Sequence, residues 1–363
     1  MSLKENNKSN LKEVKGVAQP KSIQKVKLNR EKLPSVKTFV QHIRNGDVKF
    51  LSKAITLVES TNQKHQAKAS EILQKCLPYT NNSIRIGITG VPGVGKSTFI
   101  EALGTFLVQK GKKVAVLAID PSSSLHRGSI MGDKTRMEQL VKTSKAYIRP
   151  SPSGDSLGGV AKKTRETILL CEAAGFDVIL IETVGVGQSE TAVHSMVDFF
   201  LLLKLAGAGD ELQGIKRGIV EMADAIVINK ADGANTKHAE LAKAAFTRAL
   251  HLYPSKESAW QPKVTVCSAL NNEGIDSVWK TISNYIALTK SNSYFETKRN
   301  EQNKFWVYET IDEYLRGQFY KNSEIKKELK KVLHSVELQD LTPFEAAERL
   351  LAFYQKKVRN KLS

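Results

Sequence analysis

A glycine-rich loop at residues 90–98 constrains the fold more than any other feature of this chain. It fills every fixed position of the pattern G-x-x-x-x-G-K-[S/T], in which backbone N–H groups surround the phosphates of a nucleotide. Glycine is needed where the backbone approaches phosphate in conformations that a Cβ atom would block. The loop therefore predicts a phosphate-binding site, with Lys96 at the β- and γ-phosphates and Ser97 at Mg²⁺. The nine residues are Gly90, Val91, Pro92, Gly93, Val94, Gly95, Lys96, Ser97 and Thr98.

The residues on both sides of the loop agree with this prediction. Ile84–Thr89 is a short run of β-forming residues, and Thr98–Val108 has apolar residues at helical spacing. A strand, a glycine-rich loop and a helix in this order bring the positive end of the helix dipole to the phosphates. This context disfavours the alternative of a glycine-rich turn that matches the pattern by chance.

Length and composition indicate a globular protein of the cytoplasm. The 363 residues are 41% hydrophobic, which is enough for one large domain or for two to three smaller ones. No run of 18 uninterrupted apolar residues predicts a membrane span, and the first residues lack the apolar stretch of a signal peptide. The three cysteines are widely spaced, so we expect buried thiols rather than disulfides or a zinc site.

The formal net charge of +18 raises the question of nucleic-acid binding. The lysines are spread along the chain, and aromatic residues are not interleaved with them as a stacking surface requires. We therefore expect a basic soluble surface and no nucleic-acid partner. Residues 1–34 are rich in Lys, Asn and Ser, which predicts a disordered basic tail. A mitochondrial transit peptide is the other interpretation of this tail, but its three glutamates and its shortage of arginine oppose it.

The spacing of apolar residues divides the rest of the chain into three predicted parts. Residues 35–80 have helical spacing, residues 81–290 alternate strands with helices, and residues 291–363 are helical. Strands that are apolar almost throughout are typical of a parallel sheet covered on both faces. The predicted fold is an α/β P-loop NTPase with a mostly parallel central sheet, an N-terminal helical segment and a C-terminal helical arm. The predicted strands are Ile84–Thr89, Val114–Asp120, Asp177–Thr183, Val197–Lys204, Ala225–Asn229 and Lys263–Ser268.

The C-terminal arm is predicted to present two apolar faces. Trp306, Ile311, Tyr314, Leu315 and Phe319 are assigned to the first, and Leu350, Leu351 and Tyr354 to the second. Such faces must be buried either on the arm's own domain or on a second subunit. We favour the second alternative, which predicts a homodimer that forms through this arm.

The tetrapeptide at residues 229–232, Asn-Lys-Ala-Asp, indicates which base the nucleotide carries. Guanine offers N1–H and N2–H₂ as adjacent donors, and the carboxylate of Asp232 can accept both hydrogen bonds. Adenine has no such donor pair on that edge, so this site favours GTP over ATP. Lys230 is expected to lie along the ring, and Asn229 to tie the base loop to the P-loop. The backbone N–H groups of Ser268, Ala269 and Leu270 are expected near the guanine O6.

Three acidic residues are candidates for the metal and the γ-phosphate. Asp120 and Glu182 end predicted strands, and parallel strands present their carboxyl ends at the ligand site. Because Mg²⁺ keeps several waters, we expect Ser97 as the direct side-chain ligand, with the acids acting largely through water. Asp133 is the third candidate. The alternatives are a helix cap for Asp120 and an ordinary surface charge for Asp133.

Together these motifs resemble the MeaB/ArgK family of methylmalonyl-CoA mutase-associated GTPases. Besides the P-loop and the base motif, the resemblance depends on residues 117–124 (LAIDPSSS), 132–137 (GDKTRM) and 182–190 (ETVGVGQSE). It implies binding of GTP, GDP and Mg²⁺, and a chaperone that protects, loads and reactivates an adenosylcobalamin-dependent acyl-CoA mutase. It also implies a first switch with Asp120 and Asp133, a second with Glu182, and a further switch loop at residues 207–216.

Hydrolysis of GTP depends on positioning and charge stabilisation more than on covalent chemistry. Lys96 is expected at the β/γ charge, and Glu182 or Gln188 at the attacking water. Gln188 follows the switch glycine Gly185 by three residues instead of directly, which predicts slow hydrolysis without a partner. The alternative functions are a metallochaperone-type GTPase, a P-loop kinase that acts on a transport or periplasmic binding protein, and a GTP-regulated interaction protein.

Overall fold

The computed structural model describes residues 33–119, 137–150, 157–183, 188–206 and 217–362. Nearly all of the predicted basic tail lies outside these ranges. The described strands are β1 (Ile84–Gly90), β2 (Val114–Ile119), β3 (Ala146–Arg149), β4 (Val178–Thr183), β5 (Phe199–Leu205), β6 (Ala225–Asn229) and β7 (Lys263–Val266). The helices up to the sixth strand are α1 (Val36–Arg44), α2 (Val48–Glu59), α3 (Gln63–Cys76), α4 (Lys96–Gln109), α6 (Glu138–Val141), α7 (Leu157–Ala173), α8 (Gln188–His194) and α9 (Arg217–Met222). They are followed by α10 (Thr236–Leu250), α11 (Ile275–Ser291), α12 (Tyr294–Tyr320), α13 (Ser323–Glu337) and α14 (Pro343–Leu362), and short 3₁₀ turns lie at Leu77–Tyr79 and Gly233–Asn235.

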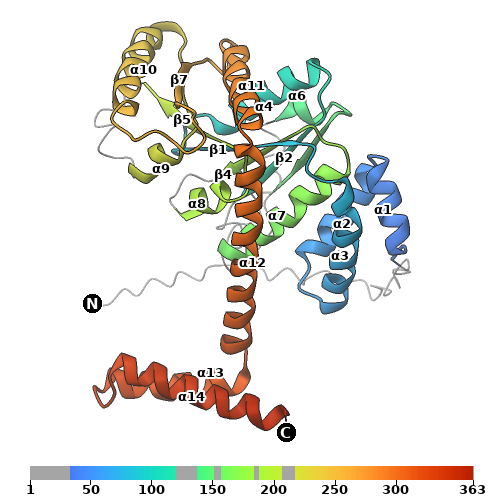
Figure 1. The fold of residues 1–363 in the computed structure, drawn as a ribbon, viewed down its shortest axis with the longest axis vertical. Helices are drawn as coiled ribbons and strands as arrows, with labels where there is room; N and C mark the ends of the chain where they lie inside the picture. Colours follow the sequence, from blue (N-terminus) through green and yellow to red (C-terminus); the bar gives the residue numbers. More distant parts are fainter. Residues whose placement is uncertain (1–32, 120–136, 151–156, 184–187, 207–216, 363) are drawn as a thin grey trace, which may run out of the picture. The chain divides into compact units, whose positions relative to one another are not determined.

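The described strands form one sheet with the order β3-β2-β4-β1-β5-β6-β7 (Figure 1). Every pair of neighbouring strands is parallel, so the predicted α/β fold is confirmed and the sheet is parallel throughout. Strand β1 lies between β4 and β5, with Ile88 opposite Glu182 and Gly90 opposite Leu203. This register brings the carboxyl ends of the three central strands together at the P-loop.

The sequence-based strand assignments miss β3, place the start of β5 too early and place the end of β7 at Ser268 instead of Val266. Strand β3 was not predicted, because it is only four residues long, contains a tyrosine and an arginine, and pairs with β2 alone. Strand β5 begins at Phe199 instead of Val197. Asp198 precedes it because its carboxylate accepts a hydrogen bond from the backbone N–H of Arg85 and is paired with Arg299. These polar contacts determine where the preceding turn ends and β5 begins. The spacing of apolar residues does not reveal this position.

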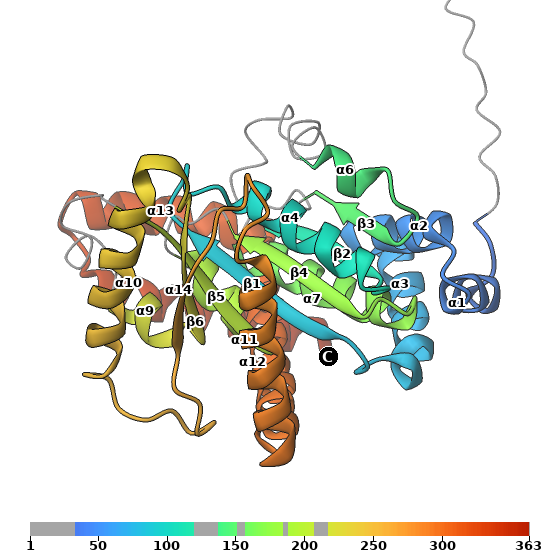
Figure 2. The same cartoon turned by 90° about the horizontal axis from the view of Figure 1, so that it is seen from above.

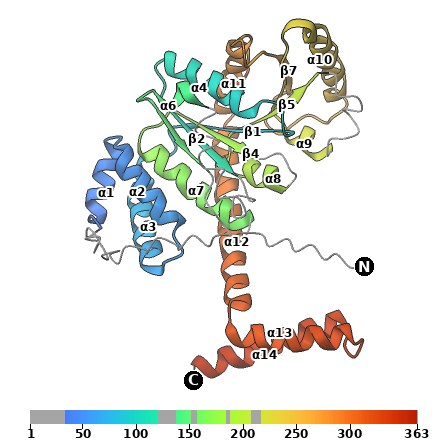
Figure 3. The same ribbon diagram turned by 180° about the vertical axis from the view of Figure 1, so that it is seen from behind.

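Helices cover both faces of the sheet (Figure 2). Helices α4 and α11 contribute to the apolar core on one face, where Phe99 and Tyr285 are buried with Phe199. The core on the other face contains residues of α7 and α8 and, packed on α7, the N-terminal helices α1–α3 (Figure 3). Phe39 and Ile168 belong to this second core. Continuous burial of the strands on both faces explains why they are almost entirely apolar.

The side chains of helix α12 that pack against the core and those that are exposed do not match the apolar face predicted for the arm. Trp306 packs against the core of the α7 face, whereas Ile311, Tyr314 and Leu315 are 49%, 66% and 58% exposed. At about 3.6 residues per turn, the step of nine residues from Trp306 to Leu315 is about two and a half turns, so the two side chains point in opposite directions. The assignment of both to one face is therefore wrong.

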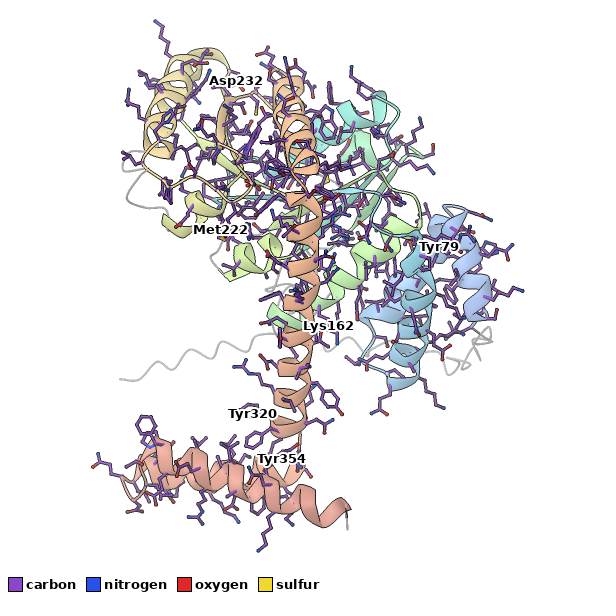
Figure 4. All side chains as sticks on the ribbon, viewed as in Figure 1. Tyr79, Lys162, Met222, Asp232, Tyr320 and Tyr354 are labelled. Carbon is purple, nitrogen blue, oxygen red and sulfur yellow. The ribbon has the colours of Figure 1, made fainter. Side chains whose placement is uncertain are left out.

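Helices α13 and α14 pack against each other through a small apolar cluster. Val332, Ala346 and Leu350 are buried there, and Phe319 from the end of α12 packs against them. Phe319 also makes an edge contact with the ring of Tyr354, which lies near Tyr320 where α12 meets this pair of helices (Figure 4). Among the helices that the structure describes, none is long and apolar enough to cross a membrane.

Candidate functional site

The P-loop connects β1 to α4 through glycines that no other residue could replace without a rearrangement. Gly90 has a φ of +154°, and a Cβ atom there would lie 2.6 Å from the backbone oxygen of Leu203 in β5. Gly95 has a φ of +91°, and its Cβ would lie 2.9 Å from Nδ2 of Asn229. The loop is thus pressed against both β5 and the base motif. Helix α4 begins at Lys96, so its N-terminus faces the phosphate site that the sequence predicts.

Lys96 lies inside the loop instead of extending into solvent. Its Nζ donates hydrogen bonds to the backbone oxygens of Gly90 and Val91 at 2.8 and 3.3 Å, and the residue is only 9% exposed. Burial lowers the pKa of Lys96, while the carboxylates of Glu182 and Glu190 favour its charged form and oppose that shift. The ammonium group therefore lies where a phosphate oxygen could replace a backbone carbonyl as its partner.

Ser97, in the first turn of α4, lies beside Glu182, near the end of β4. The Ser97 hydroxyl donates a hydrogen bond to Oε1 of Glu182 at 3.2 Å. Directly beside them, the hydroxyl of Thr183 donates to that of Thr89 at 2.8 Å, which ties β4 to β1 below the loop. The described residues contain no group of three or more His, Cys, Asp or Glu side chains that could hold a metal. One hydroxyl and one carboxylate still suit Mg²⁺, which prefers oxygen ligands and retains several waters.

Asn229 joins three loops at the opposite end of the site. Its Nδ2 donates to the backbone oxygen of Val94 in the P-loop at 2.9 Å. Its Oδ1 accepts from the backbone N–H of Ala269 at 3.1 Å and from the Cys267 thiol at 3.4 Å. The expected hydrogen bond between the base loop and the P-loop is thus present, and the same side chain also holds the segment after β7.

Asp232 is held by the segment that follows β7. The Ser268 hydroxyl donates to Oδ2 of Asp232 at 2.6 Å and accepts from the backbone N–H of Asn271 at 3.2 Å. Lys230 has a φ of +57°, and its backbone oxygen accepts a hydrogen bond from the side chain of Asn235 at 2.6 Å. Asp232 lies between β6 and α10 (Figure 4). The neighbouring Leu270, whose backbone N–H is predicted to contact the base, is 76% exposed.

Comparison with known proteins agrees with the geometry. The model of the family described as methylmalonyl-CoA mutase-associated GTPase MeaB matches residues 51–324. The chain belongs to the MeaB family. A probable GTPase of Mycobacterium tuberculosis is 48% identical over 309 residues, which cover 85% of this chain and 92% of that protein. The mitochondrial methylmalonic aciduria type A homolog of Mus musculus is 42% identical over 333 residues and covers 88% of this chain and 80% of its own length.

A solved structure of the same kind supports the fold. The crystal structure of an LAO/AO transport system kinase superposes with a TM-score of 0.72 and 38% identity, covering 89% of this chain and all of that chain. The predictions of a P-loop fold and of a GTPase are thereby confirmed at the level of the family.

Several predicted site residues of this MeaB family member lie outside the part of the chain that the structure describes. Asp120, Asp133 and the switch loop at residues 207–216 are outside the described residues, and only the backbone of Gln188 is described, at the start of α8. Glu190 was not a candidate, although it is 1% exposed and its charge acts on Lys96. Its place in the residue 182–190 motif is the sequence signal that could have identified it. Its burial agrees with its effect on Lys96, because a carboxylate is seldom buried without an electrostatic partner.

Proposed function

We propose that this chain is a GTP-binding and GTP-hydrolysing chaperone of an adenosylcobalamin-dependent acyl-CoA mutase of the methylmalonyl-CoA mutase type. The proposed role is to protect, load and reactivate that mutase. The observation that carries the proposal is the family match over residues 51–324, since the family is described by its association with this mutase. The relative named for methylmalonic aciduria supports the same class of partner.

The base site proposed here depends on Asp232 for guanine. Ser268 fixes one carboxylate oxygen of Asp232, which leaves the carboxylate oriented toward the adjacent N1–H and N2–H₂ donors of the base. We assign Lys230 to the ring face, and the N–H groups of residues 268–270 to the guanine O6. Adenine would leave this carboxylate without its donors, which is the physical basis for selecting GTP.

The phosphate site proposed here combines the loop N–H groups, Lys96 and the pair formed by Ser97 and Glu182. Lys96 stabilises the charge that develops on the β- and γ-phosphates, because its ammonium group is already directed into the loop. Ser97 would hold Mg²⁺ directly, with Glu182, Asp120 and Asp133 contributing largely through water. The ion, when bound, neutralises phosphate charge as in other P-loop enzymes. Glu182 or Gln188 orients the attacking water.

A homodimer formed through the arm belongs to the same proposal. Helix α12 exposes a continuous apolar strip whose large side chains would lie in water in a single copy. The strip consists of Val307, Tyr308, Ile311, Tyr314 and Leu315, which are between 49% and 69% exposed. A second copy of the chain would cover this strip, and the measurement that checks it is the molar mass in solution by light scattering. The cytoplasmic location expected from the sequence stays a prediction.

The solved relative is named a transport system kinase, which favours a second candidate function. This candidate is a P-loop kinase that acts on a transport or periplasmic binding protein. The two candidates differ in where the γ-phosphate goes: to water in the first, and to a protein side chain in the second. Incubation of the chain with γ-labelled GTP and a candidate binding protein separates them, because only a kinase leaves label on protein.

The experiment that tests the chaperone proposal is a pull-down with a cobalamin-dependent acyl-CoA mutase in the presence of GDP or a non-hydrolysable GTP analogue. We expect retention of the mutase and faster phosphate release when it is added to the chain. The variant Lys96→Ala, which should not bind nucleotide, is the control for nucleotide dependence. The proposal is wrong if the mutase is not retained in any nucleotide state and leaves the hydrolysis rate unchanged.

A further inference from the structure

Helix α12 makes a series of hydrogen bonds to residues 194–198, here called the α8–β5 turn. Gln302, 6% exposed, donates from Nε2 to the backbone oxygen of Val197 at 2.8 Å and reaches that of His194 at 3.5 Å. One turn further along, Trp306 donates from Nε1 to the backbone oxygen of Ser195 at 3.2 Å. Three backbone oxygens of this turn are therefore held by side chains of the arm helix.

The preceding turn of α12 fixes the end of the same segment by charge. Arg299 donates to both carboxylate oxygens of Asp198, at 2.8 and 2.6 Å, and both residues are buried. Lys298 donates to the backbone oxygen of Asp198 at 2.9 Å. Side chains from three successive turns of α12 thus hold the α8–β5 turn along its length, an arrangement that leaves this turn little freedom to move.

Strand β1 fixes the position of α8 independently. A Cβ atom at Gly87 would lie 2.8 Å from Cγ1 of Val193 and 3.1 Å from Cγ2 of Val197, so the helix and its turn lie directly on the strand backbone. Gly87 is three residues before the first glycine of the P-loop. A shift of α8 toward the sheet would therefore press on the strand that leads into the phosphate site.

Helix α8 also carries a charge that acts on the P-loop lysine. Glu190, in its first turn, is buried, and its carboxylate favours the charged form of Lys96 together with Glu182. The helix begins at Gln188, a few residues after β4 ends with Glu182 and Thr183. Any displacement of α8 would alter the electrostatic surroundings of Lys96.

We propose that Gln302 and Trp306 are positioning residues for GTP hydrolysis. By fixing the α8–β5 turn, they hold α8, and with it Glu190, in the place that hydrolysis requires. Neither side chain belongs to the elements that form the nucleotide site. The inference rests on the GTP hydrolysis of the proposed function but not on the mutase. It gives the arm helix a direct effect on the rate of hydrolysis, in addition to the apolar strip that it exposes.

The test uses the full chain without any mutase. Gln302→Met and Trp306→Phe, singly and combined, remove the hydrogen-bond donors and retain most of the apolar volume. Lys304→Met, an exposed position on the same turn of α12, is the first control. Asn303→Leu is the second, because it removes the contact of α12 with Arg165 of α7 and leaves the α8–β5 turn untouched. Single-turnover hydrolysis is measured per bound GTP, together with the dissociation constant for GTP.

We expect the double variant to hydrolyse bound GTP about 10-fold more slowly, since small misplacements of catalytic groups have large effects on rate. Its affinity for GTP, and the rates of both controls, should stay within about twofold of wild type. An unchanged or increased rate per bound GTP in the double variant would overturn the inference. So would a decrease shared equally by Asn303→Leu, because it would indicate general loosening of the arm.

The outcome also separates this inference from the chaperone proposal. If the wild-type chain does not hydrolyse GTP above background with or without the mutase, both are wrong. If it hydrolyses GTP and the double variant is slow, but the mutase is not retained in the pull-down and leaves the hydrolysis rate unchanged, only the chaperone proposal fails.

Discussion

The hydroxyl of Ser268 donates a hydrogen bond of 2.6 Å to the carboxylate of Asp232. The two residues follow different strands, β7 and β6, which are neighbours in the sheet. This bond orients the carboxylate on which the proposed selection of guanine depends. Ser268 therefore belongs to the proposed base site together with the aspartate that it holds.

Removal of this hydroxyl should weaken the binding of GTP. We expect Ser268→Ala to raise the dissociation constant of GTP about 10-fold, because a hydrogen bond to a charged group contributes roughly 1.5–3 kcal/mol. Binding measured with a fluorescent GTP analogue and by calorimetry checks this. Ser277→Ala, an exposed serine on α11, serves as the matched control and should bind like wild type. Equal GTP affinities of the two variants would remove Ser268 from the base site.

Substitution of the P-loop lysine should abolish nucleotide binding while the fold survives. Lys96 provides the charge inside the loop, and its loss should lower the affinity for GTP at least about 100-fold. The carbonyls of Gly90 and Val91 that it now binds lie at the loop and could be hydrated instead. Equilibrium binding and far-UV circular dichroism of Lys96→Ala are the measurements, with Lys112→Ala as control. Undiminished affinity for GTP in a folded variant would contradict the phosphate assignment.

The sequence was most informative where local chemistry decides the structure. The spacing of apolar residues predicted the strands because a sheet buried on both faces requires them. The P-loop and the residues Asn229–Asp232 were found because backbone approach to phosphate and pairing with guanine each demand particular residue types at fixed spacing. These motifs do lie at the carboxyl ends of two strands of the same parallel sheet, β1 and β6, which have β5 between them.

Contacts between distant segments could not be predicted in the same way. Glu190 acts on the charge of Lys96 only because folding brings α8 close to that lysine, which is far from it in the sequence. Trp306 was assigned to the same apolar face as Leu315, yet its indole N–H donates to the backbone oxygen of Ser195 in the partly buried α8–β5 turn. An indole can satisfy either role, and only tertiary packing decides between them.

The buried pair formed by Arg299 and Asp198 should be important for stability. Arg299 also donates to the backbone oxygens of Asn81 and Ser83, so its loss would leave a buried carboxylate without its charge partner and two carbonyls without this donor. We expect Arg299→Met to lower the free energy of unfolding by about 3 kcal/mol. Urea denaturation of this variant, compared with Arg316→Met at an exposed site on the same helix, measures the effect. Equal stabilities would show that other groups satisfy the Asp198 carboxylate.

His194 should make the protein less stable as the pH falls below neutrality. Burial, together with the nearby charges of Lys298 and Lys256 and against the opposing charge of Asp224, lowers the pKa of His194 to about 4. The unfolded chain, with an ordinary histidine pKa near 6.5, therefore binds a proton between pH 6.5 and 4 that the folded chain does not. Stability from this group is complete above pH 6.5 and is lost as the pH falls toward 4.

The change from pH 7 to pH 5 should cost about 2 kcal/mol through His194 alone. Carboxylates also titrate in this range, so the informative quantity is the difference between wild type and His194→Phe, which preserves the edge contact of the ring with Phe200. We expect the free energy of unfolding of His194→Phe to fall less steeply between these two pH values. His251→Gln, at an exposed position, should retain the wild-type slope. If the slopes of wild type and His194→Phe coincide, His194 is protonated equally in the folded and unfolded chains, and its burial does not control the pH dependence.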